Sequence, residues 1–329
     1  MPQRGSQEWF DQVREEVIDP DRPIVDPHHH LWPEGGARPY GLDELHSDVD
    51  DGHHIVRTVF IECGAAYDRG STDPLAPLAE TEFVAGESER DPRHLIGGIV
   101  ARADLRRDDL DDILDRHAEI GGELFKGIRD ALASADHPEV MAIAGRAPRD
   151  LAHDRDFRRG VARLGERGLT YDTWHYHYQM PDFVELARAV PGTTMVLDHF
   201  GTPLGVGPYE GHRDEIFEQW KLDLADAAAC PNVVAKLGGL AMPDNGYGWH
   251  ARDRPATSDE LVAAQRDWYL RTIEVFGPDR CMFESNFPVD RLSISYRSWW
   301  NAAKKIAAEF TADEQDAMFR GTASRIYRL

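Results

Sequence analysis

Residues 24–32 of the chain read IVDPHHHLW, and the interpretation of the whole sequence starts from this stretch. Its first half is apolar and β-branched, as expected of a buried strand, and three histidines follow. His28 and His30 alternate across one residue, so on a strand their side chains lie on the same face. Two imidazoles on one inward face suit a divalent metal or an oxyanion, although a histidine-rich loop without function is the simpler alternative. His29 points to the other face, where we expect a structural role.

Seven further β-rich apolar runs follow, and the starts of the eight runs lie 25 to 48 residues apart. Most of the gaps carry apolar residues at the i, i+3, i+4 spacing of a helix. A strand–helix repeat predicts a parallel sheet, and eight units favour a closed barrel over an open sheet. No GxGxxG follows the first run, which argues against a dinucleotide-binding fold. We therefore predict an α/β protein with a single (β/α)8 TIM barrel. The seven later runs begin at Ile55, His94, Leu124, Leu169, Thr194, Asn232 and Arg280.

The chain is expected to form one domain with short additions at both ends. Residues 1–23 are polar and form a predicted N-terminal extension, with a helix over about 6–18, while residues 24–329 form the barrel. No Ser/Gly-rich linker divides the chain. Two more helices are expected after the last strand, at 299–310 and 312–327.

Two details of the region after the seventh strand can be predicted. Ser258, which follows Thr257, is the expected N-cap of a helix over 258–276. The preceding stretch, residues 241–257, is rich in Gly, Pro and Asn. Loops that follow strands face the active site of a barrel, so this one is either a lid or a tolerated insertion.

Composition restricts the classes of partner. The 329 residues carry a net charge of −22 and are 41% hydrophobic. So acidic a chain repels phosphate backbones, which argues against nucleic-acid binding. No apolar run is long enough for a membrane span, and the N-terminus lacks the apolar core of a signal peptide. Three widely spaced cysteines fit a reducing cytoplasm. We expect a cytoplasmic protein that acts on a small molecule, and a homo-oligomer remains open.

Two histidines follow the fifth strand in the stretch TWHYHYQ. His175 and His177 again occupy alternate positions, and one of them is a candidate third metal ligand. Either could equally be a packed or solvated histidine. Trp32 and Trp174 lie near the inferred rim of the barrel and are candidates for contact with a flat or ring-shaped ligand, although tryptophans more often serve packing.

Acid–base chemistry is expected from the ends of the sixth and eighth strands. His199 stands before a Gly/Pro turn at the rim, where a histidine is well placed to move a proton. Glu284 and Asn286 are predicted to share a face of the eighth strand. A carboxylate inside a barrel is costly unless it is paired or ligates a metal. The alternative is that Glu284 is satisfied by an arginine or by backbone donors.

Three further charged residues follow or occupy strands. Arg129, at the end of the fourth strand, could hold a substrate carboxylate in a bidentate pair. Lys236, on the seventh strand, is a second candidate for substrate binding. Lys236 and Glu62 could equally form a buried ion pair.

Several of these motifs, in this order, resemble the amidohydrolase-2 family, which includes sugar-lactone and pyrone-dicarboxylate lactonases as well as nonoxidative decarboxylases and hydratases. The resemblance extends over residues 25–290 and is closer to the lactonase branch. It is carried by VDPHHHLW, GIRDAL, YDTWHYHYQMPDF, VLDHFGTPLG, AKLGGL and RCMFESNFPVD.

The resemblance implies roles for individual residues. His28 and His30 match the family's HxH on the first strand, and His175 or His177 matches its third histidine. His199 matches the histidine that handles water or substrate, and Arg129 falls where the family often contacts substrate. The resemblance also implies a divalent metal, most readily zinc, although some lactonases of this branch work without one.

The eighth strand departs from the family's pattern. The family usually has Ser-Asp before the aromatic-Pro pair, and that aspartate binds metal or activates water, whereas this chain has Ser285-Asn286. An amide cannot take up a proton as a carboxylate does. Glu284 could take over the role, His199 could be the base, or hydrolytic activity could have been lost.

The expected function is hydrolysis of a lactone or similar cyclic ester of a carboxylated or sugar-like substrate. Water would be activated by His199 or Glu284, with or without a metal. The first alternative is a metal-dependent lyase, either a nonoxidative decarboxylase or a hydratase. The second is a barrel that binds a ligand without turning it over.

Overall fold

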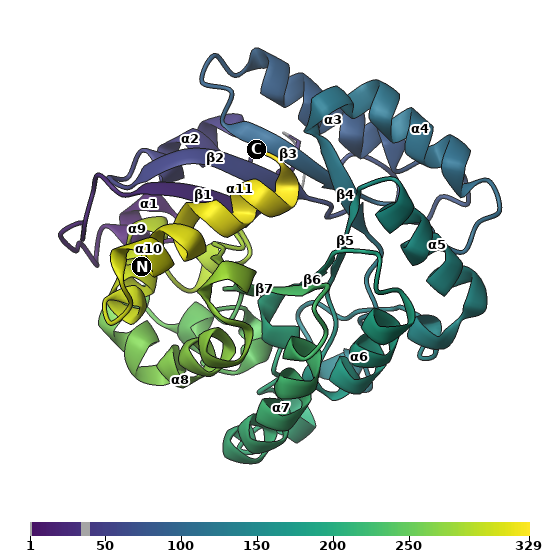
Figure 1. The fold of residues 1–329 in the computed structure, drawn as a ribbon. Helices are drawn as coiled ribbons and strands as arrows, with labels where there is room; N and C mark the ends of the chain where they lie inside the picture. Colours follow the sequence, from purple (N-terminus) through teal and green to yellow (C-terminus); the bar gives the residue numbers. More distant parts are fainter. Residues whose placement is uncertain (1, 34–39) are drawn as a thin grey trace.

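A computed structural model describes residues 2–33 and 40–329, and eight parallel strands form its centre (Figure 1). Neighbours in sequence are neighbours in the sheet, in the order β1 to β8. This confirms the predicted (β/α)8 barrel and all eight strands. The strands are β1 (Pro23–His29), β2 (His54–Ile61), β3 (Ile96–Ala101), β4 (Phe125–Arg129), β5 (Thr170–Thr173), β6 (Met195–Leu197), β7 (Val233–Leu237) and β8 (Cys281–Phe283).

The barrel closes where the first strand meets the segment after the last. His29 and Phe287 form a parallel bridge. The amide of His30 donates to the carbonyl of Phe287 at 2.8 Å, and the amide of Asn286 donates to the carbonyl of His28 at 3.0 Å. The histidine stretch is thereby joined to the ESNFP segment, so residues more than 250 positions apart in sequence share one rim.

Helices surround the barrel (Figure 1). They follow the strands because amphipathic segments bury one face on a parallel sheet. Those between the strands are α2 (Leu42–Val49), α3 (Leu78–Arg90), α4 (Leu110–Gly121), α5 (Arg155–Glu166), α6 (Met180–Ala189), α7 (Arg213–Ala228) and α8 (Ser258–Phe276). The terminal ones are α1 (Gln7–Phe10), α9 (Tyr296–Ala307), α10 (Ala312–Asp316) and α11 (Thr322–Tyr327), the last two joined by a π-helical turn at Ala317–Gly321.

The predicted bounds of α8 are confirmed, whereas its N-cap, the N-terminal helix and the helix expected at 299–310, which spans Tyr296–Ala307, differ from the prediction. The N-terminal helix spans only Gln7–Phe10 and not residues 6–18. The N-cap of α8 is Thr257 rather than Ser258: its hydroxyl accepts from the amide of Glu260 at 3.1 Å, and its own amide donates to the Glu260 carboxylate at 2.9 Å. This reciprocal capping box satisfies two amides at once. It leaves Ser258 as the first helical residue.

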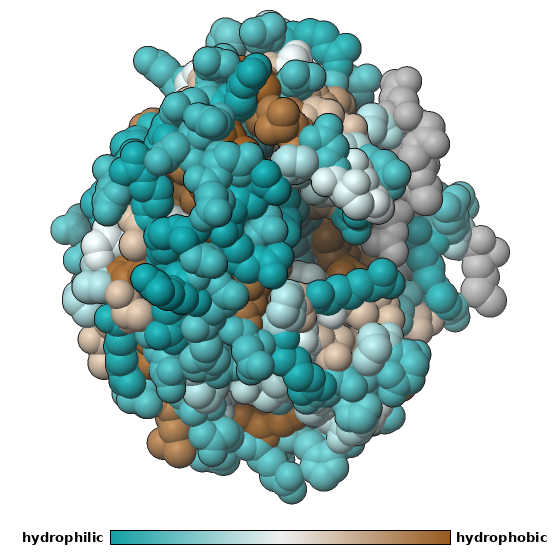
Figure 2. Space-filling model, turned by 90° about the vertical axis from the view of Figure 1, so that its right-hand side faces the viewer, coloured by the Kyte–Doolittle hydropathy of each residue, from teal (hydrophilic) through white to brown (hydrophobic). Residues whose placement is uncertain are grey.

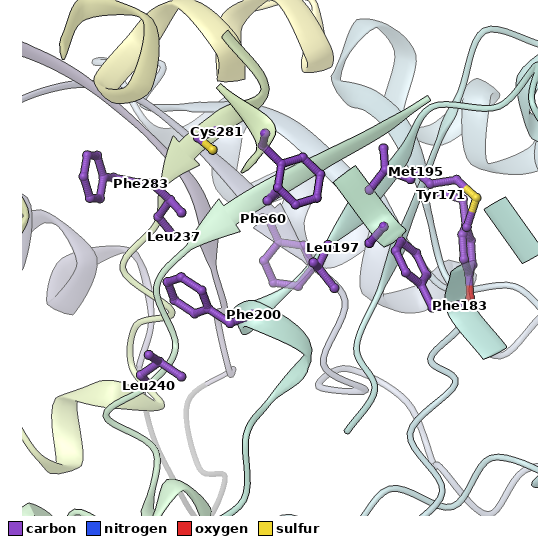
Figure 3. Packing of buried hydrophobic residues seen from close by; sticks show 14 of the residues in the cluster. Phe60, Tyr171, Phe183, Met195, Leu197, Phe200, Leu237, Leu240, Cys281 and Phe283 are labelled. Atoms are coloured by element: carbon purple, nitrogen blue, oxygen red, sulfur yellow. The ribbon is translucent and has the colours of Figure 1, made fainter. Parts of the chain in front are cut away.

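The larger apolar core lies between the strands and the helices. Phe60, Tyr171, Leu197 and Phe283 belong to it and are fully buried, and Figure 3 shows their packing. Each buried side chain of this size contributes about 1.5–3 kcal/mol. This layer holds the strands in place, and the strand ends in turn carry the polar groups described below.

A second core fills the barrel near the N-terminal ends of the strands. Val234 shares a face of β7 with Lys236, since alternate residues of a strand face the same side, and it lies nearer the start of the strand. Ala323, Ile326 and Tyr327 of the C-terminal segment pack onto this layer. Helix α11 therefore closes this end of the barrel with apolar side chains. The strand residues of the layer are Val25, Val59, Ile61, Val100, Val196, Val234 and Met282.

The face drawn in Figure 2 is mostly hydrophilic, as the high content of charged residues predicts. It is hollowed at one place where apolar residues show between hydrophilic ones. Within the described residues, no helix is both long and apolar enough to cross a membrane.

Candidate active site

His28 of β1 and His30, the residue after β1, meet at the C-terminal end of the barrel. His28 is fully buried and His30 is nearly so, and their Nε2 atoms lie 3.3 Å apart. Nδ1 of His30 lies 2.8 Å from the carbonyl of Ile61, to which it donates. Burial, with Lys236 beside His28 and Arg129 beside His30, holds the pKa of both well below the usual value. Both imidazoles are therefore neutral.

Glu284 joins His28 to His199. Its Oε1 lies 2.7 Å from Nδ1 of His199, and its Oε2 lies 2.7 Å from Nδ1 of His28. A carboxylate beside Nδ1 favours the tautomer in which that nitrogen carries the proton. Nε2 of His199 then keeps its lone pair, as a general base requires. Glu284 is completely buried, so this contact is well shielded from water.

The backbone around His199 is strained. His199 and Phe200 have φ values of +54° and +58°, and Thr202 has +42°, all in the left-handed region. Such conformations cost about 1–3 kcal/mol each and persist where the surrounding structure enforces them. Gly239 faces the ring: a Cβ there would lie 2.1 Å from Nδ1 of His199. Gly239 thus leaves the space that the histidine occupies, and Gly238 does the same for Glu284.

Lys236 lies at the centre of the buried polar cluster. Its Nζ is 3.0 Å from Oδ2 of Asp172, 3.0 Å from Oδ1 of Asp198 and 3.2 Å from Nδ1 of His28. Nζ donates to Oδ2 of Asp172, forms an ion pair with Asp198 and lies within hydrogen-bond distance of Nδ1 of His28. Burial alone would lower the pKa of Lys236, but Asp198 and Asp172 raise it above its usual value. The lysine therefore remains charged.

Arg129 is engaged within the protein. Its Nε donates to Oε1 of Glu62 at 2.9 Å, and Nη2 donates to the carbonyl of the same residue. Nη1 lies 3.3 Å from Oδ2 of Asp198 and 3.5 Å from Nε2 of His28. The suggested Lys236–Glu62 pair does not form, because each residue has another partner. Four of the five N–H donors of Arg129 are therefore engaged within the protein, where Arg129 holds Asp198 in place, and its contact with a substrate carboxylate stays a prediction.

The charges of this cluster do not balance. Burial raises the pKa of Asp198, but Lys236, His199 and Arg129 outweigh that effect and hold it below the usual value. Four carboxyl groups lie around two cationic side chains, and burial raises the pKa of one carboxyl group, that of Asp172. A cluster with more carboxyl groups than cationic side chains suits a bound cation. The carboxyl groups belong to Glu62, Asp172, Asp198 and Glu284, and the cations to Arg129 and Lys236.

The donor atoms fit a divalent metal. His28, Asp198 and His199 each offer a ligand atom, and these atoms lie within 4.8 Å of one another. Oδ1 of Asp198 and Oε2 of Glu284 are buried without a hydrogen bond in the described part of the chain, although both lie near charged or imidazole nitrogens. Two imidazoles and a carboxylate are ligands that zinc accepts. The site can therefore hold a divalent metal.

Neither histidine that follows β5 belongs to this group of three. His175 stacks on Phe183 of α6, with ring centroids 5.0 Å apart, so it packs against the outer helix. His177 accepts from the amide of Leu204 at 3.3 Å and contacts the ring of Tyr209. The strand instead directs Asp172 into the barrel. Asp172, and not His175, faces Lys236. That one of the two histidines is a third metal ligand stays a prediction.

Asn286 also lies apart from the proposed chemistry. The strand ends at Phe283, and Asn286 has a φ of +55°, so it does not continue the face that carries Glu284. Its Nδ2 donates to Oδ1 of Asp290 at 3.0 Å. Of the two residues predicted to share a face, only Glu284 reaches the histidines.

The predicted aromatic contacts lie at the rim. Trp32 is partly exposed and its ring centroid is 5.7 Å from that of His30, so it borders the site. Trp174 is partly exposed too and packs on Tyr176. Both remain candidates for substrate contact.

The long loop after β7 is anchored to its neighbours. The carboxylate of Asp244 accepts from the amides of Ala142 and Ile143 at 2.7 and 2.9 Å. Nδ2 of Asn245 donates to the carbonyl of Pro203 at 2.7 Å, and Trp249 is buried. These bonds connect residues 241–257 to two other rim loops.

Three residues of the cluster were not singled out from the sequence. Asp198 stands directly before His199 in the DHFG motif, and its place at a strand end was the available signal. Asp172 is the inward residue of β5, which the strand's phase would have identified. The third, Tyr327 on α11, donates to Oδ2 of Asp172 at 2.5 Å. No local sequence pattern predicts that contact.

Known relatives resemble the chain over nearly its full length. An L-fucono-1,5-lactonase of Burkholderia multivorans is 30% identical, with 93% of this chain and 96% of the relative covered. A protein of Sinorhizobium fredii described as uncharacterized is 32% identical over 94% of this chain and 99% of its own.

Solved structures agree with these relatives. An amidohydrolase of Burkholderia multivorans with bound zinc superposes with a TM-score of 0.73 at 28% identity, covering 93% of this chain and 99% of its own. The amidohydrolase family matches residues 25–329, from the first barrel strand onward. The strand-end histidines, the barrel and these similarities together show that the chain belongs to the amidohydrolase family.

Proposed function

We propose that the protein hydrolyses a lactone or similar cyclic ester of a sugar-like or carboxylated substrate. The observation that carries this proposal is the carboxylate of Glu284, which lies 2.7 Å from Nδ1 of both His28 and His199. It leaves Nε2 of His199 as a base at the C-terminal end of the barrel, where barrel enzymes place their chemistry. The similarity to an L-fucono-1,5-lactonase supports a sugar lactone as the substrate.

His199 takes a proton from water through Nε2 as the water attacks the lactone carbonyl. Glu284 accepts the hydrogen bond from Nδ1 and stabilises the imidazolium that forms. The same His199 then returns the proton to the ring oxygen as the ester bond opens, so the proton balance closes on one residue. General acid–base catalysis of this kind contributes about 10²–10⁴-fold to a rate.

Zinc is the metal we propose for the site, held by His28, Asp198 and His199 with the second β1 histidine, His30, beside them. When bound, it would polarise the substrate carbonyl and lower the pKa of water. Should the metal occupy Nε2 of His199, Glu284 is the remaining base. Arg129 and Lys236 keep Asp198 ionised and oriented in either case.

The test is hydrolysis of a panel of aldonolactones, beginning with L-fucono-1,5-lactone, followed by acid release in weakly buffered solution. The protein is purified without chelator or nickel resin, and its metal content is measured in parallel. We expect turnover, and a loss of about 10²-fold or more in His199→Asn. His117→Asn is the matched control, because His117 is also a buried, hydrogen-bonded histidine, but it belongs to α4 and contacts α3 and the residue after β3.

The outcomes separate the alternatives. Carbon dioxide release from an aromatic or dienoic acid, without lactone hydrolysis, would replace the proposal with a decarboxylase. Uptake of water across a double bond would replace it with a hydratase. Tight binding of a lactone without turnover, unchanged in His199→Asn, would show a binding protein.

A further inference from the structure

The closed end of the barrel is linked to the active site by one line of polar groups. Tyr327 belongs to α11, and its ring is completely buried in the apolar layer that closes the barrel. Its hydroxyl nevertheless donates to Oδ2 of Asp172, at 2.5 Å. A tyrosine at the end of the chain thus reaches the carboxylate that pairs with Lys236.

Asp172 is held from three sides. Oδ2 accepts from Tyr327 and from Nζ of Lys236 at 3.0 Å, while Oδ1 accepts from the hydroxyl of Thr170 at 2.8 Å. All four side chains are at most 2% exposed. In so dry a setting each hydrogen bond is strong, and each missing one is costly. The position of the carboxylate, and hence of Lys236, depends on the hydroxyl of Tyr327.

Lys236 in turn faces Nδ1 of His28, where two groups compete. Nζ donates toward Nδ1 from 3.2 Å, which favours a proton on Nε2. Oε2 of Glu284 lies 2.7 Å from the same Nδ1, which favours a proton there. The tautomer of His28 therefore depends on where Lys236 is held.

We propose that Tyr327 is a positioning residue for the active site: by fixing Asp172 and Lys236 it sets the tautomer of His28 and the orientation of Asp198. The catalytic consequence rests on the proposed function, whereas the structural consequence does not. The C-terminal helix is then part of the active-site support as well as a cover for the barrel.

The test removes only the hydroxyl, with Tyr327→Phe, which keeps the ring in the apolar layer. Without that donor, Asp172 draws Lys236 toward itself and away from His28. We expect the metal-free variant to shift His28 toward the form protonated on Nδ1. Nitrogen-15 NMR of histidine-labelled protein reports this directly, with His28→Gln used to assign the signal. In the lactonase assay with saturating zinc, kcat should fall on the order of 10-fold with little change in KM.

A matched control separates positioning from general loss of a buried hydrogen bond. Tyr40 is equally buried and donates to Asp48 at 2.8 Å, and Asp48 also pairs with a cation, Arg291 at 3.1 Å. Tyr40→Phe removes the same group from the same kind of triad outside the site. We expect a similar fall in melting temperature and no change in the His28 signal.

A second variant tests the route. Asp172→Asn weakens the same link one step closer to Lys236, so Tyr327→Phe should add little to it if Asp172 carries the effect. An unchanged His28 tautomer in Tyr327→Phe, or the same change in Tyr40→Phe, would overturn the inference. Absence of lactone turnover in the unmodified protein would instead overturn the proposed function and leave the NMR result to decide this one.

Discussion

The interior of the barrel is apolar at one end and polar at the other. At the N-terminal end, Val234 and its neighbours pack against Ile326 and Tyr327, and the layer contains almost no polar atom. At the other end, fully buried Glu284 and Lys236 share the interior with histidines. The first arrangement is stable because it is apolar, and the second survives only because each charge has partners. The apolar layer and the polar cluster therefore occupy different parts of the barrel interior, and Lys236 lies where they meet.

The largest expected effect comes from removing that border residue. Lys236→Met leaves Asp172 and Asp198 buried without their shared cation, and breaking a buried pair in this way costs about 3–5 kcal/mol. We expect urea unfolding to show a loss of this size, or no folded protein at all. Lys221→Met is the matched control, since Lys221 pairs with Glu218 on the surface and such pairs contribute about 0–1 kcal/mol. Equal losses in the two variants would contradict a central role for Lys236.

The next test disturbs the polar cluster at the C-terminal end of the barrel, here called the mouth, and leaves the apolar layer at the closed end intact. In Gly239→Ala the new Cβ would lie 2.1 Å from Nδ1 of His199, so the ring must move away from Glu284. A displacement of about 1 Å can cost about 10²-fold in rate, and we expect a loss of that order in kcat/KM.

Gly248→Ala is the control for the backbone strain in that experiment. Gly248 has a φ of +68°, close to the +74° of Gly239, but a Cβ there meets nothing within 4 Å. It therefore pays the same conformational cost without moving a side chain. If both variants lost activity equally, the close approach of Gly239 to His199 would not be the cause.

The converse experiment weakens the closed end and spares the mouth. Val100 of β3 is completely buried in the apolar layer. Val100→Ala leaves a small cavity there and should cost on the order of 1–3 kcal/mol of unfolding free energy. Lactone turnover at 25 °C should stay within about twofold of the unmodified protein. A large loss of kcat at unchanged stability would show that the two layers are not independent.

The difference between the two ends also explains what the sequence could predict. The strands were predictable because most are runs rich in apolar and β-branched residues, a pattern imposed by burial of both faces, and because they recur between helical segments. His28 stands on such a run, and His30, one residue past the end of β1, keeps the alternation because its amide still bonds the carbonyl of Phe287. These features are local, and so is their signal.

Alternation failed where the chain had already left the strand. The strands end at Thr173 and Phe283, before His175 and Asn286. Beyond those points the backbone turns and side-chain direction no longer follows a period of two. His175 consequently packs on α6, and Asn286 bonds Asp290. Strand ends cannot be fixed to one residue from composition.

The ion pairs around Lys236 could not be predicted from local sequence patterns. Lys236 has partners from β1, β5 and β6, and Tyr327 comes from the last helix. Each contact joins residues brought together only when the barrel closes. A single lysine or aspartate in a strand indicates that a partner must exist, but not which residue provides it.

The smallest expected effect is a pH-dependent difference in folding stability, which separates a buried carboxyl group near the mouth from the apolar closed end. Glu80 of α3 is almost fully buried, and its Oε1 accepts from the amides of Cys63 and Ala65, just after β2, at 3.1 and 2.7 Å. Burial, with Glu62 nearby, raises its pKa to about 7. Because this pKa is raised in the folded state, folding takes up a proton, and stability falls as pH rises from about 4.5 to about 7. Glu80→Gln keeps Oε1 as an acceptor and removes the charge.

The variant should therefore melt higher than the unmodified protein at pH 8, by about 2 °C or more, and the advantage should vanish near pH 5. Val100→Ala provides the contrast, because its loss comes from an apolar contact and should be the same at both values. A gain of the same size at both pH values would mean that Glu80→Gln stabilises the protein through packing and not through loss of the buried charge. A gain confined to high pH would show that the ionised carboxylate of Glu80, near the C-terminal end of the barrel, lowers the stability of the fold, a pH-dependent effect that the apolar layer does not have.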